Sequence, residues 1–369
     1  SFQAPEDENV VLPTEAEAIE MLAAVKNEAI EAPVEEEIRT TLVEDAPKAG
    51  KIRKTAYNEI LGTTEWTLSN GVRVIVKPTE FKQDEILFYA TSLGGHSQVK
   101  TEDLPSALLA TDVVELAGLA DMNVTDLQKA LTGKRVSLSP SIGGNSESLS
   151  GSSTVKDLET LLQLNYLYFT APRRDEESYQ TLMSILESQL ANRDKNPKVA
   201  FNDSIQMMTS NNSERTVIFT KELLEKVSLD KALEVYKARF ANPADFTFFF
   251  VGNVNPEDST FKAQVCQWLG GLKANKKKEK VVDHQVRVPL GKQQNYFTQK
   301  MEIKTASNRI QYTSYSMPYT LANDLNMEMI GRILSTRYLE SIREREGGSY
   351  GVGCAGWMNI RPVPSAVLI

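Results

Sequence analysis

Histidine and cysteine, the side chains that most often bind metals or act as nucleophiles, are scarce in this chain of 369 residues. Neither His96, followed by Ser-Gln-Val-Lys, nor His284, followed by Gln-Val-Arg-Val, lies in an H-E-x-x-H or H-x-x-E-H motif. Because a catalytic zinc usually takes three protein ligands, we predict no metal site here and expect both histidines in exposed loops. Two cysteines, Cys266 and Cys354, are too few for a disulfide scaffold or a Cys-rich zinc module.

Two further motifs resemble catalytic or nucleotide-binding sites but lack the required context. Residues 144–148 (Gly-Asn-Ser-Glu-Ser) lack the closing glycine of a nucleophile elbow and the lysine of a P-loop. Residues 351–356 match G-x-G-x-x-G, but a predicted helix precedes them and residues 357–362 cannot start a helix, so dinucleotide binding is not expected. We predict instead a strand from Tyr350 with one bare face, which permits close approach of another backbone or a helix. The small residues of that face are Gly351, Gly353 and Ala355.

Composition and charge exclude several classes of protein. The chain is 41% hydrophobic and 24% charged, with a mean hydropathy of -0.32, and its length suggests two or three domains. No apolar run approaches the ~18 residues that span a bilayer, and residues 1–5 lack a basic and apolar leader, so any signal peptide would belong to a precursor. Residues 1–50 hold 13 acidic and 3 basic residues, which gives this segment a charge of -10. Since the net charge of the chain is -8, residues 51–369 sum to +2. A nucleic-acid partner is therefore not expected.

The elements that must position any site begin after a connector. We predict residues 1–60 to be acidic and partly helical, with a helix over 15–30 and a solvated acidic run at 35–37. A first α+β domain is expected over 61–285, with a type I′ turn at Asn70-Gly71. Strands are expected over 66–68, 72–76, 86–90, 136–139, 148–154 and 247–251, and helices over 104–119, 158–171, 179–190 and 261–269.

A second α+β domain is expected over 286–369. Strands are predicted over 300–303 and 309–317, and the helix after Asn323 carries adjoining apolar stripes. The chain stops within an apparent strand at Ile369, so this domain is expected to be truncated. Residues 273–280 are lysine-rich without interleaved aromatic residues, which predicts a solvated linker. Strands and helices that do not alternate strictly as βαβ units favour the α+β class.

Four segments together resemble the insulinase/pitrilysin family of zinc metallopeptidases, whose catalytic motif is the inverted H-x-x-E-H. These segments are residues 68–76, 92–95, 250–252 and, most distinctively, 342–352. The long bacterial members consist of two homologous halves, each with two α+β domains, that close around a peptide chamber. The resemblance covers most of residues 62–369 and implies a duplicated fold of this type.

The resemblance implies that this chain is the C-terminal, non-catalytic half. The catalytic half carries H-x-x-E-H on an early helix, whereas the equivalent helix here, residues 108–116, has no histidine. In family members the non-catalytic half contributes an arginine and a tyrosine, seven residues apart, that reach the substrate beside the zinc. Arg343 and Tyr350 have this spacing, although the insulin-degrading branch has glycine where this chain has Ser349.

The same resemblance implies a zinc-dependent bacterial endopeptidase whose zinc and general base lie in the other half. This chain should be inactive alone and hold no cofactor. Its partners would be the N-terminal catalytic half, on the same or a neighbouring polypeptide, and a peptide substrate, in the periplasm or cell envelope. The alternative function is a non-catalytic structural or peptide-binding subunit, as in the core proteins of respiratory complexes. By residue type alone, Arg343 also suits the surface of a helix C-terminus, and Tyr350 a half-buried strand.

Overall fold

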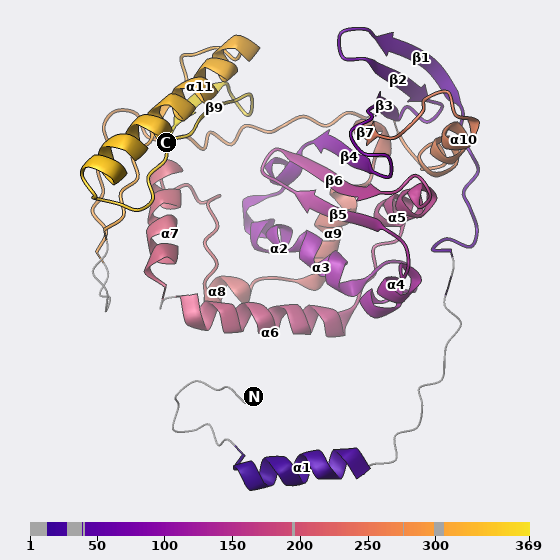
Figure 1. Ribbon diagram of the computed structural model, residues 1–369, viewed down its shortest axis with the longest axis horizontal. Helices are drawn as coiled ribbons and strands as arrows, with labels where there is room; N and C mark the ends of the chain where they lie inside the picture. The colour runs from indigo at the N-terminus through magenta and orange to yellow at the C-terminus, as the bar shows by residue number, and fades with distance from the viewer. Residues whose placement is uncertain (1–12, 28–38, 40, 194–195, 276, 299–305) are drawn as a thin grey trace. The chain divides into compact units, whose positions relative to one another are not determined.

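The computed structural model of the chain describes residues 13–27, 39, 41–193, 196–275, 277–298 and 306–369 (Figure 1). The chain divides into two compact units, residues 1–39 and 40–369. In the first unit, helix α1 spans Glu15–Asn27, which confirms the predicted helix as far as it is described; residues 28–30 and 35–37 lie outside the described part. Thr14 and Glu17 form a capping box, since the Thr14 N–H donates to Glu17 Oε2 at 2.8 Å and the Glu17 N–H to Thr14 Oγ1 at 3.3 Å.

A mixed sheet of seven strands is the centre of the second unit. The strands are β1 Ile52–Asn58, β2 Thr63–Leu68, β3 Arg73–Pro78, β4 Ile86–Leu93, β5 Val136–Ile142, β6 Ser146–Ser153 and β7 Thr247–Gly252. Their order is β1-β2-β3-β7-β4-β6-β5, and only the β3–β7 pair is parallel. All six strands predicted for this domain are confirmed.

The turn between β2 and β3 differs from the predicted type I′ turn. Gly71 has a φ of 90°, but Asn70 is outside the left-handed region that a type I′ turn requires of both central residues. The Asn70 side chain instead donates to the carbonyl oxygens of Leu269 at 2.9 Å and Leu272 at 3.0 Å. This tertiary contact fixes Asn70, and the Gly71 N–H closes the turn on the carbonyl of Leu68 at 3.0 Å.

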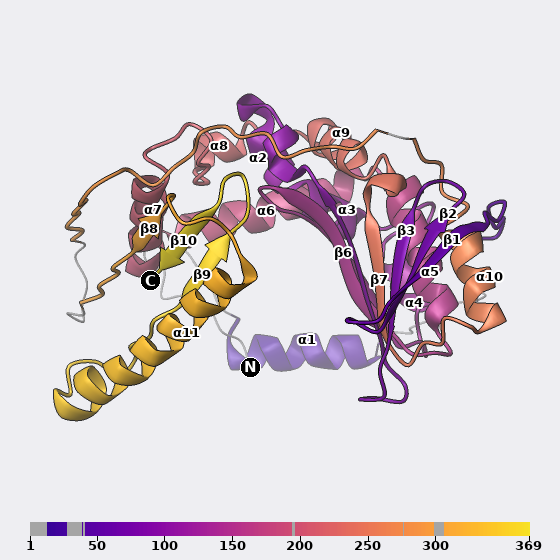
Figure 2. The ribbon, with the colours of Figure 1, turned by 90° about the horizontal axis from the view of Figure 1, so that it is seen from above.

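Helices cover one face of this sheet. The α-helices of this domain are α2 Leu104–Leu108, α3 Ala110–Ala117, α4 Val124–Ala130, α5 Leu158–Thr170, α6 Glu176–Arg193, α7 Pro197–Thr209, α8 Lys221–Leu224, α9 Leu229–Arg239 and α10 Ser259–Trp268. Figure 2 views the sheet nearly edge-on, with α3, α4 and α5 on the same side of it. Strand residues alternate accordingly: on β4, Ile86 and Phe88 are buried, whereas Leu87 and Tyr89 are exposed.

The helix predicted over 104–119 is broken into α2 and α3 at Leu109. Leu109 has a φ of -103° and a ψ of 4°, outside the helical region. It packs with Leu224 and Val227 in a small separate cluster, while the flanking residues of α2 and α3 face the main core. Because of the break, residues 104–117 contribute side chains to both hydrophobic clusters. Apolar periodicity alone does not predict such a break.

Aromatic side chains hold β7 in the middle of the sheet. Phe248 and Phe250 are fully buried, and Phe249 between them is half-buried on the other face. The Phe250 ring centroid lies 5.2 Å from that of Phe88 and 5.3 Å from that of Phe261 on α10. Edge-to-face pairs of this kind add ~0.5–1.5 kcal/mol each beyond their area burial.

Part of the segment expected to be a connector packs on this domain. The Leu42 N–H donates to Gln163 Oε1 at 2.9 Å, and the Leu42 side chain is buried. The Gly50 N–H donates to the carbonyl of Cys266 at 2.8 Å, directly before strand β1. Residues 41–58 are thus built into the sheet and its helices.

The lysine-rich loop over 273–280 exposes its described lysines, as expected of a solvated linker, but it is also anchored at several points. Arg239 Nη1 lies 2.5 Å from Glu279 Oε2, and the Arg239 side chain is only 8% exposed. The Glu279 N–H donates to Asp245 Oδ2 at 2.9 Å, and Lys278 donates to the carbonyl of Ala244. This anchoring was not predicted because the arginine and asparagine partners of the loop lie 40 and 35 residues earlier in the chain.

A second, three-stranded sheet lies in residues 306–369, with the order β8-β10-β9. Its elements are β8 Tyr312–Ser314, helix α11 Leu321–Tyr338, a π-helical turn Leu339–Arg345, β9 Gly356–Asn359 and β10 Ser365–Leu368. The helix after Asn323 is confirmed, whereas the strand expected over 309–317 shrinks to β8 and the one expected over 300–303 lies outside the described residues. The strand predicted from Tyr350 is wrong, because β9 begins only at Gly356.

Helix α11 packs on this sheet through small residues. Its buried residues are Met327 and Gly331, and the backbone N of Gly356 is 2.5 Å from where a Gly331 side chain would begin. The close approach of helix and strand predicted for this region is therefore present, but through Gly331 and Gly356. Gly351 has no atom within 4 Å of a would-be side chain, and Gly353 has only the Ser335 hydroxyl, at 3.7 Å.

Candidate functional site

Arg343 lies on the π-helical turn that ends the long helix of the second sheet. Helix α11 continues without interruption into residues 339–345, which have π-helical hydrogen bonding. The Glu346 N–H donates to the carbonyl of Ser341 at 3.1 Å, five residues back. π-Turns often occur at functional positions because the extra residue rotates the side chains that follow. Arg343 is exposed at this point.

Tyr350 is on the loop between this turn and β9, and its side chain is 88% exposed. An aromatic side chain that projects this far into solvent contributes little to the fold, so its position favours a binding role over a structural one. The interpretation of Tyr350 as a half-buried strand residue is wrong, since it lies in a loop.

The structure brings Arg343 and Tyr350 together. Arg343 Cζ is 4.8 Å from the centroid of the Tyr350 ring, which is within the range of a cation–π interaction. Stacking occupies the face of the guanidinium and leaves its in-plane N–H groups able to donate. The pair thus presents a phenolic hydroxyl and a fork of N–H donors next to each other, two groups suited to carbonyl oxygens and oxyanions.

The two histidines, far apart in sequence, line one small cavity of about 300 Å³. His96 is half-buried, with Nε2 3.3 Å from the carbonyl oxygen of Ala107, so the expectation of an exposed loop is wrong for His96. Burial, and then the charges of Arg215 and Arg239, lower the pKa of His96. His284 is exposed, and its Nε2 lies 2.8 Å from the carbonyl oxygen of Ser97.

These residues do not fit a zinc site. Among the described residues, no group of three or more His, Cys, Asp or Glu side chains is placed to hold a metal ion. Both histidines use Nε2 in contacts with backbone carbonyls, so they serve to fasten the 281–286 segment and the 94–97 turn. We therefore derive no chemical step of this chain through a metal.

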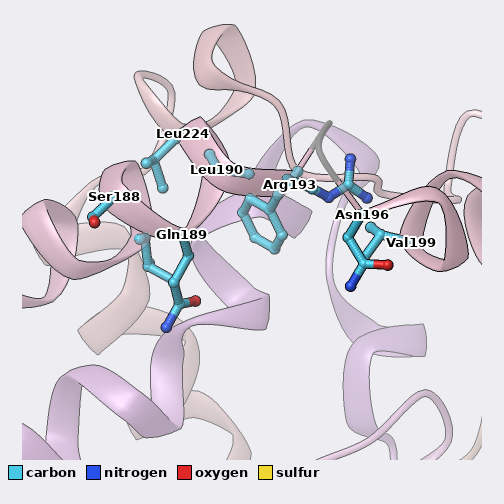
Figure 3. A pocket seen from close by; sticks show the side chains of 9 residues that line it. Ser188, Gln189, Leu190, Arg193, Asn196, Val199 and Leu224 are labelled. Atoms are coloured by element: carbon cyan, nitrogen blue, oxygen red, sulfur yellow. The ribbon is translucent and has the colours of Figure 1, made fainter. Parts of the chain in front are cut away.

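A hollow of about 580 Å³ lies between α6, α7 and α8 (Figure 3). Its apolar wall includes Leu190, Val199 and Leu224, and Gln189 and Asn196 add amide groups. Arg193, also in the wall, pairs with Asp203 at 2.5 Å. The lining includes the Ser188 hydroxyl but no histidine or carboxylate that could act as a general base, so the hollow offers no nucleophile–base pair.

A buried glutamate supports the turn that carries His96. Glu147 on β6 is 1% exposed, and its Oε2 accepts a hydrogen bond from the Gly95 N–H at 2.7 Å. Burial raises the pKa of Glu147, and hydrogen bonds from Gly95 and Ser92 and the charge of Arg239 oppose that rise only in part. The ionised form of Glu147 is therefore less favourable in the folded chain than in the unfolded one.

This raised pKa predicts a specific dependence of stability on pH. A carboxyl with a higher pKa in the folded state binds more protons there, so its contribution to stability falls as pH rises from the unfolded value toward the folded one. Glu147→Gln keeps an acceptor for the Gly95 N–H and removes the charge. We expect the unfolding free energy of Glu147→Gln at pH 7 to be no lower than that of the parent chain. In the acid range, this free energy should depend less on pH than it does in the parent. Urea titration at several pH values measures both. The exposed Glu225→Gln should keep the parent profile; a large loss of stability in Glu147→Gln at pH 7 would contradict the assignment.

Comparison with known proteins identifies the class. Residues 226–357 match the model of the family described as the peptidase M16 inactive domain. A relative from Arabidopsis thaliana named "Zinc protease PQQL-like" is 28% identical over 239 residues, which cover 64% of this chain and 22% of the relative. The chain thus spans less than a quarter of that relative's length.

Solved structures share the fold. The crystal structure of the periplasmic protease PqqL from Escherichia coli superposes with a TM-score of 0.70 at 20% identity, over 96% of this chain and 39% of that one. The structure of the first half of the same protease superposes with a TM-score of 0.55 at 14% identity, over 88% of this chain and 68% of that one. The fold of this chain therefore resembles part of the protease, and it also resembles much of the protease's first half.

These findings confirm the resemblance drawn from the sequence: residues 226–357 match the inactive domain of M16 peptidases. The relatives that the chain resembles are named as PqqL-like zinc proteases. The α+β class is confirmed as well. Among the described residues, none of the helices is both long and apolar enough to cross a membrane.

Proposed function

We propose that this chain is the non-catalytic, substrate-enclosing half of a zinc-dependent endopeptidase. The observation that carries the proposal is the exposed Arg343–Tyr350 pair, stacked at 4.8 Å in a chain that matches the inactive domain. The absence of histidine from residues 108–116 is in keeping with this assignment.

In this proposal, zinc and the general base belong to the N-terminal catalytic half, where the metal would activate the attacking water. Tyr350 donates a hydrogen bond from its hydroxyl to the oxyanion that forms on the scissile carbonyl. Arg343 donates to neighbouring carbonyl oxygens of the peptide with the in-plane N–H groups that stacking leaves free. This division of labour makes the chain inactive alone.

The proposal includes an organisation and a location. Residues 61–285, together with residues 41–58 that pack on them, would form the first peptidase-like domain and residues 286–369 the second, preceded by a connector shorter than the expected 1–60. The seven strands of the first sheet fall before residue 253 and those of the second after residue 311, which supports a boundary between them. The Escherichia coli neighbour is a periplasmic protease, which supports the same compartment for this chain.

Reconstitution tests the proposal. The 369-residue chain, a separately produced catalytic half and their mixture are assayed on a fluorogenic peptide, with zinc and with a chelator. We expect hydrolysis only in the mixture and its loss with chelator.

Two results would count against the proposal. Chelator-sensitive hydrolysis by this chain alone would reveal a metal site within it. An inactive mixture, in which the halves associate and the chain binds the labelled peptide by fluorescence anisotropy, would favour the peptide-binding subunit instead.

A further inference from the structure

The loop that joins the π-helical turn to Tyr350 has features that a simple connection does not need. Gly347 has a φ of 61°, in the left-handed region, whereas Gly348 lies outside that region. The Gly348 N–H donates to the carbonyl of Ile342 at 2.9 Å. A left-handed residue followed by such a bond is the usual closure of a helix, here one residue longer because the last turn is π-helical.

A second contact fixes the backbone on the other side. The Ser349 hydroxyl donates to the carbonyl of Gly351 at 2.9 Å, and this bond spans Tyr350. The turn at Gly347 and the Ser349 bond thus lie on either side of the short stretch that sets the direction of the tyrosine. Both groups are exposed, and a would-be side chain at Gly347 has no atom within 4 Å, so packing does not explain them.

We infer that Gly347 and Ser349 are positioning residues: they hold Tyr350 against Arg343 so that the pair meets the substrate already assembled. This inference rests on the proposed function of the pair. If the loop were flexible, Tyr350 would lie against Arg343 in only a fraction of the molecules. Only that fraction could react, so the observed rate would be lower. Ser349, where relatives in one branch have glycine, is then a local reinforcement and not a defect of the motif.

The test uses the full chain with Gly347→Ala, Gly347→Asn and Gly348→Ala. Because open space surrounds Gly347, alanine there adds only the cost of a left-handed backbone, which asparagine tolerates better. Gly347→Ala should reduce kcat of the reconstituted mixture about 5- to 30-fold with little change in KM. Gly347→Asn should retain most of the activity, and Gly348→Ala, which has room and an ordinary φ, should match the parent chain.

The Ser349 bond is tested in the same way. Ser349→Ala should lower kcat about two- to tenfold, as expected for the loss of one hydrogen bond, and Ser349→Thr should restore it because the hydroxyl remains. A structural readout accompanies each variant. The readout is NMR of the chain isotopically labelled at arginine, in which the side-chain N–H resonance of Arg343 is assigned by its disappearance in Arg343→Lys. The ring current of Tyr350 should displace this resonance in the parent chain and in Gly347→Asn. It should lose this displacement in Gly347→Ala.

The two readouts separate the inference from the proposed function. If Gly347→Ala keeps both the displaced resonance and the parent kcat, the positioning role is wrong. If Tyr350→Phe and Arg343→Ala leave hydrolysis unchanged, the proposed function of the pair fails, and the resonance alone then decides whether Gly347 holds the stack. Where Tyr350→Phe and Arg343→Ala do lower kcat, loss of the displaced resonance in Gly347→Ala with unchanged kcat would also overturn the inference, since the position of Tyr350 would then have no catalytic effect.

Discussion

Tyr350→Phe is expected to lower kcat of the reconstituted peptidase about 100-fold. The substitution removes one hydroxyl and keeps the aromatic ring, so the stack with Arg343 at 4.8 Å persists. One hydrogen-bond donor aimed at a developing oxyanion is worth ~3 kcal/mol in the transition state, which corresponds to this factor. KM should change little, because the oxyanion is absent from the ground state. The measurement is steady-state hydrolysis with saturating catalytic half.

A matched control separates the role of the hydroxyl from general damage to the surface. Tyr312 on β8 is also exposed, at 68%, and lies in the same sheet unit. Tyr312→Phe should therefore retain the parent kcat. Equal losses in both variants, or none in Tyr350→Phe, would remove Tyr350 from the reaction.

The order of strands and helices in the first domain could be predicted from sequence because each element carries its own periodic signal. Phe248 and Phe250 alternate with half-buried neighbours, and Thr154 and Asp157 bond to each other just before α5, at 2.8 and 3.1 Å. Errors arose where tertiary contacts override local preference. Asn70 leaves the type I′ geometry to reach two carbonyls about 200 residues away, and Leu109 breaks a helix to join another cluster.

The candidate site was predicted only as far as residue spacing allows. The separation of seven positions between Arg343 and Tyr350 indicated the pair through the family resemblance, and the structure places the two in contact. The loop that makes this contact was expected to be a strand, because alternating small residues after Tyr350 suggest one. The positive φ of Gly347 and the Ser349 bond have only a weak signal in sequence, a Gly-Gly pair after a helix, which indicates a cap but not what the cap orients.

The apolar stripes predicted on α11 show the same limit. Periodicity identified the helix, but Leu325, Met329 and Ile333 are 50–58% exposed, and the sheet is contacted through Met327 and Gly331 instead. Hydrophobicity therefore predicted the existence of the helix but not its packing face. Here that face is set by how closely two backbones can approach.

Gly331→Ala is expected to destabilise the contact between α11 and β9 by about 2–3 kcal/mol. In an ordinary helix interior the change would stabilise by ~1 kcal/mol, so the expected sign is opposite to the helix propensity. The added methyl would lie 2.5 Å from the backbone N of Gly356 and 2.9 Å from the carbonyl carbon of Ala355. Backbone atoms cannot rotate away as a side chain can, so helix and strand must separate, as in overpacked cores.

The loss should be local and can be measured by hydrogen exchange of peptides from α11 and β9. A change of this size corresponds to about 30- to 150-fold faster exchange through local opening, while peptides from the seven-stranded sheet should be unaffected. Gly351→Ala is the matched control, because no atom lies within 4 Å of the new methyl and its φ is not positive. Unchanged exchange in Gly331→Ala, or an equal effect of Gly351→Ala, would show that the close approach at Gly331 does not hold the helix on the sheet. The expected result instead makes Gly331 the residue that fixes α11, and with it the π-helical turn that carries Arg343.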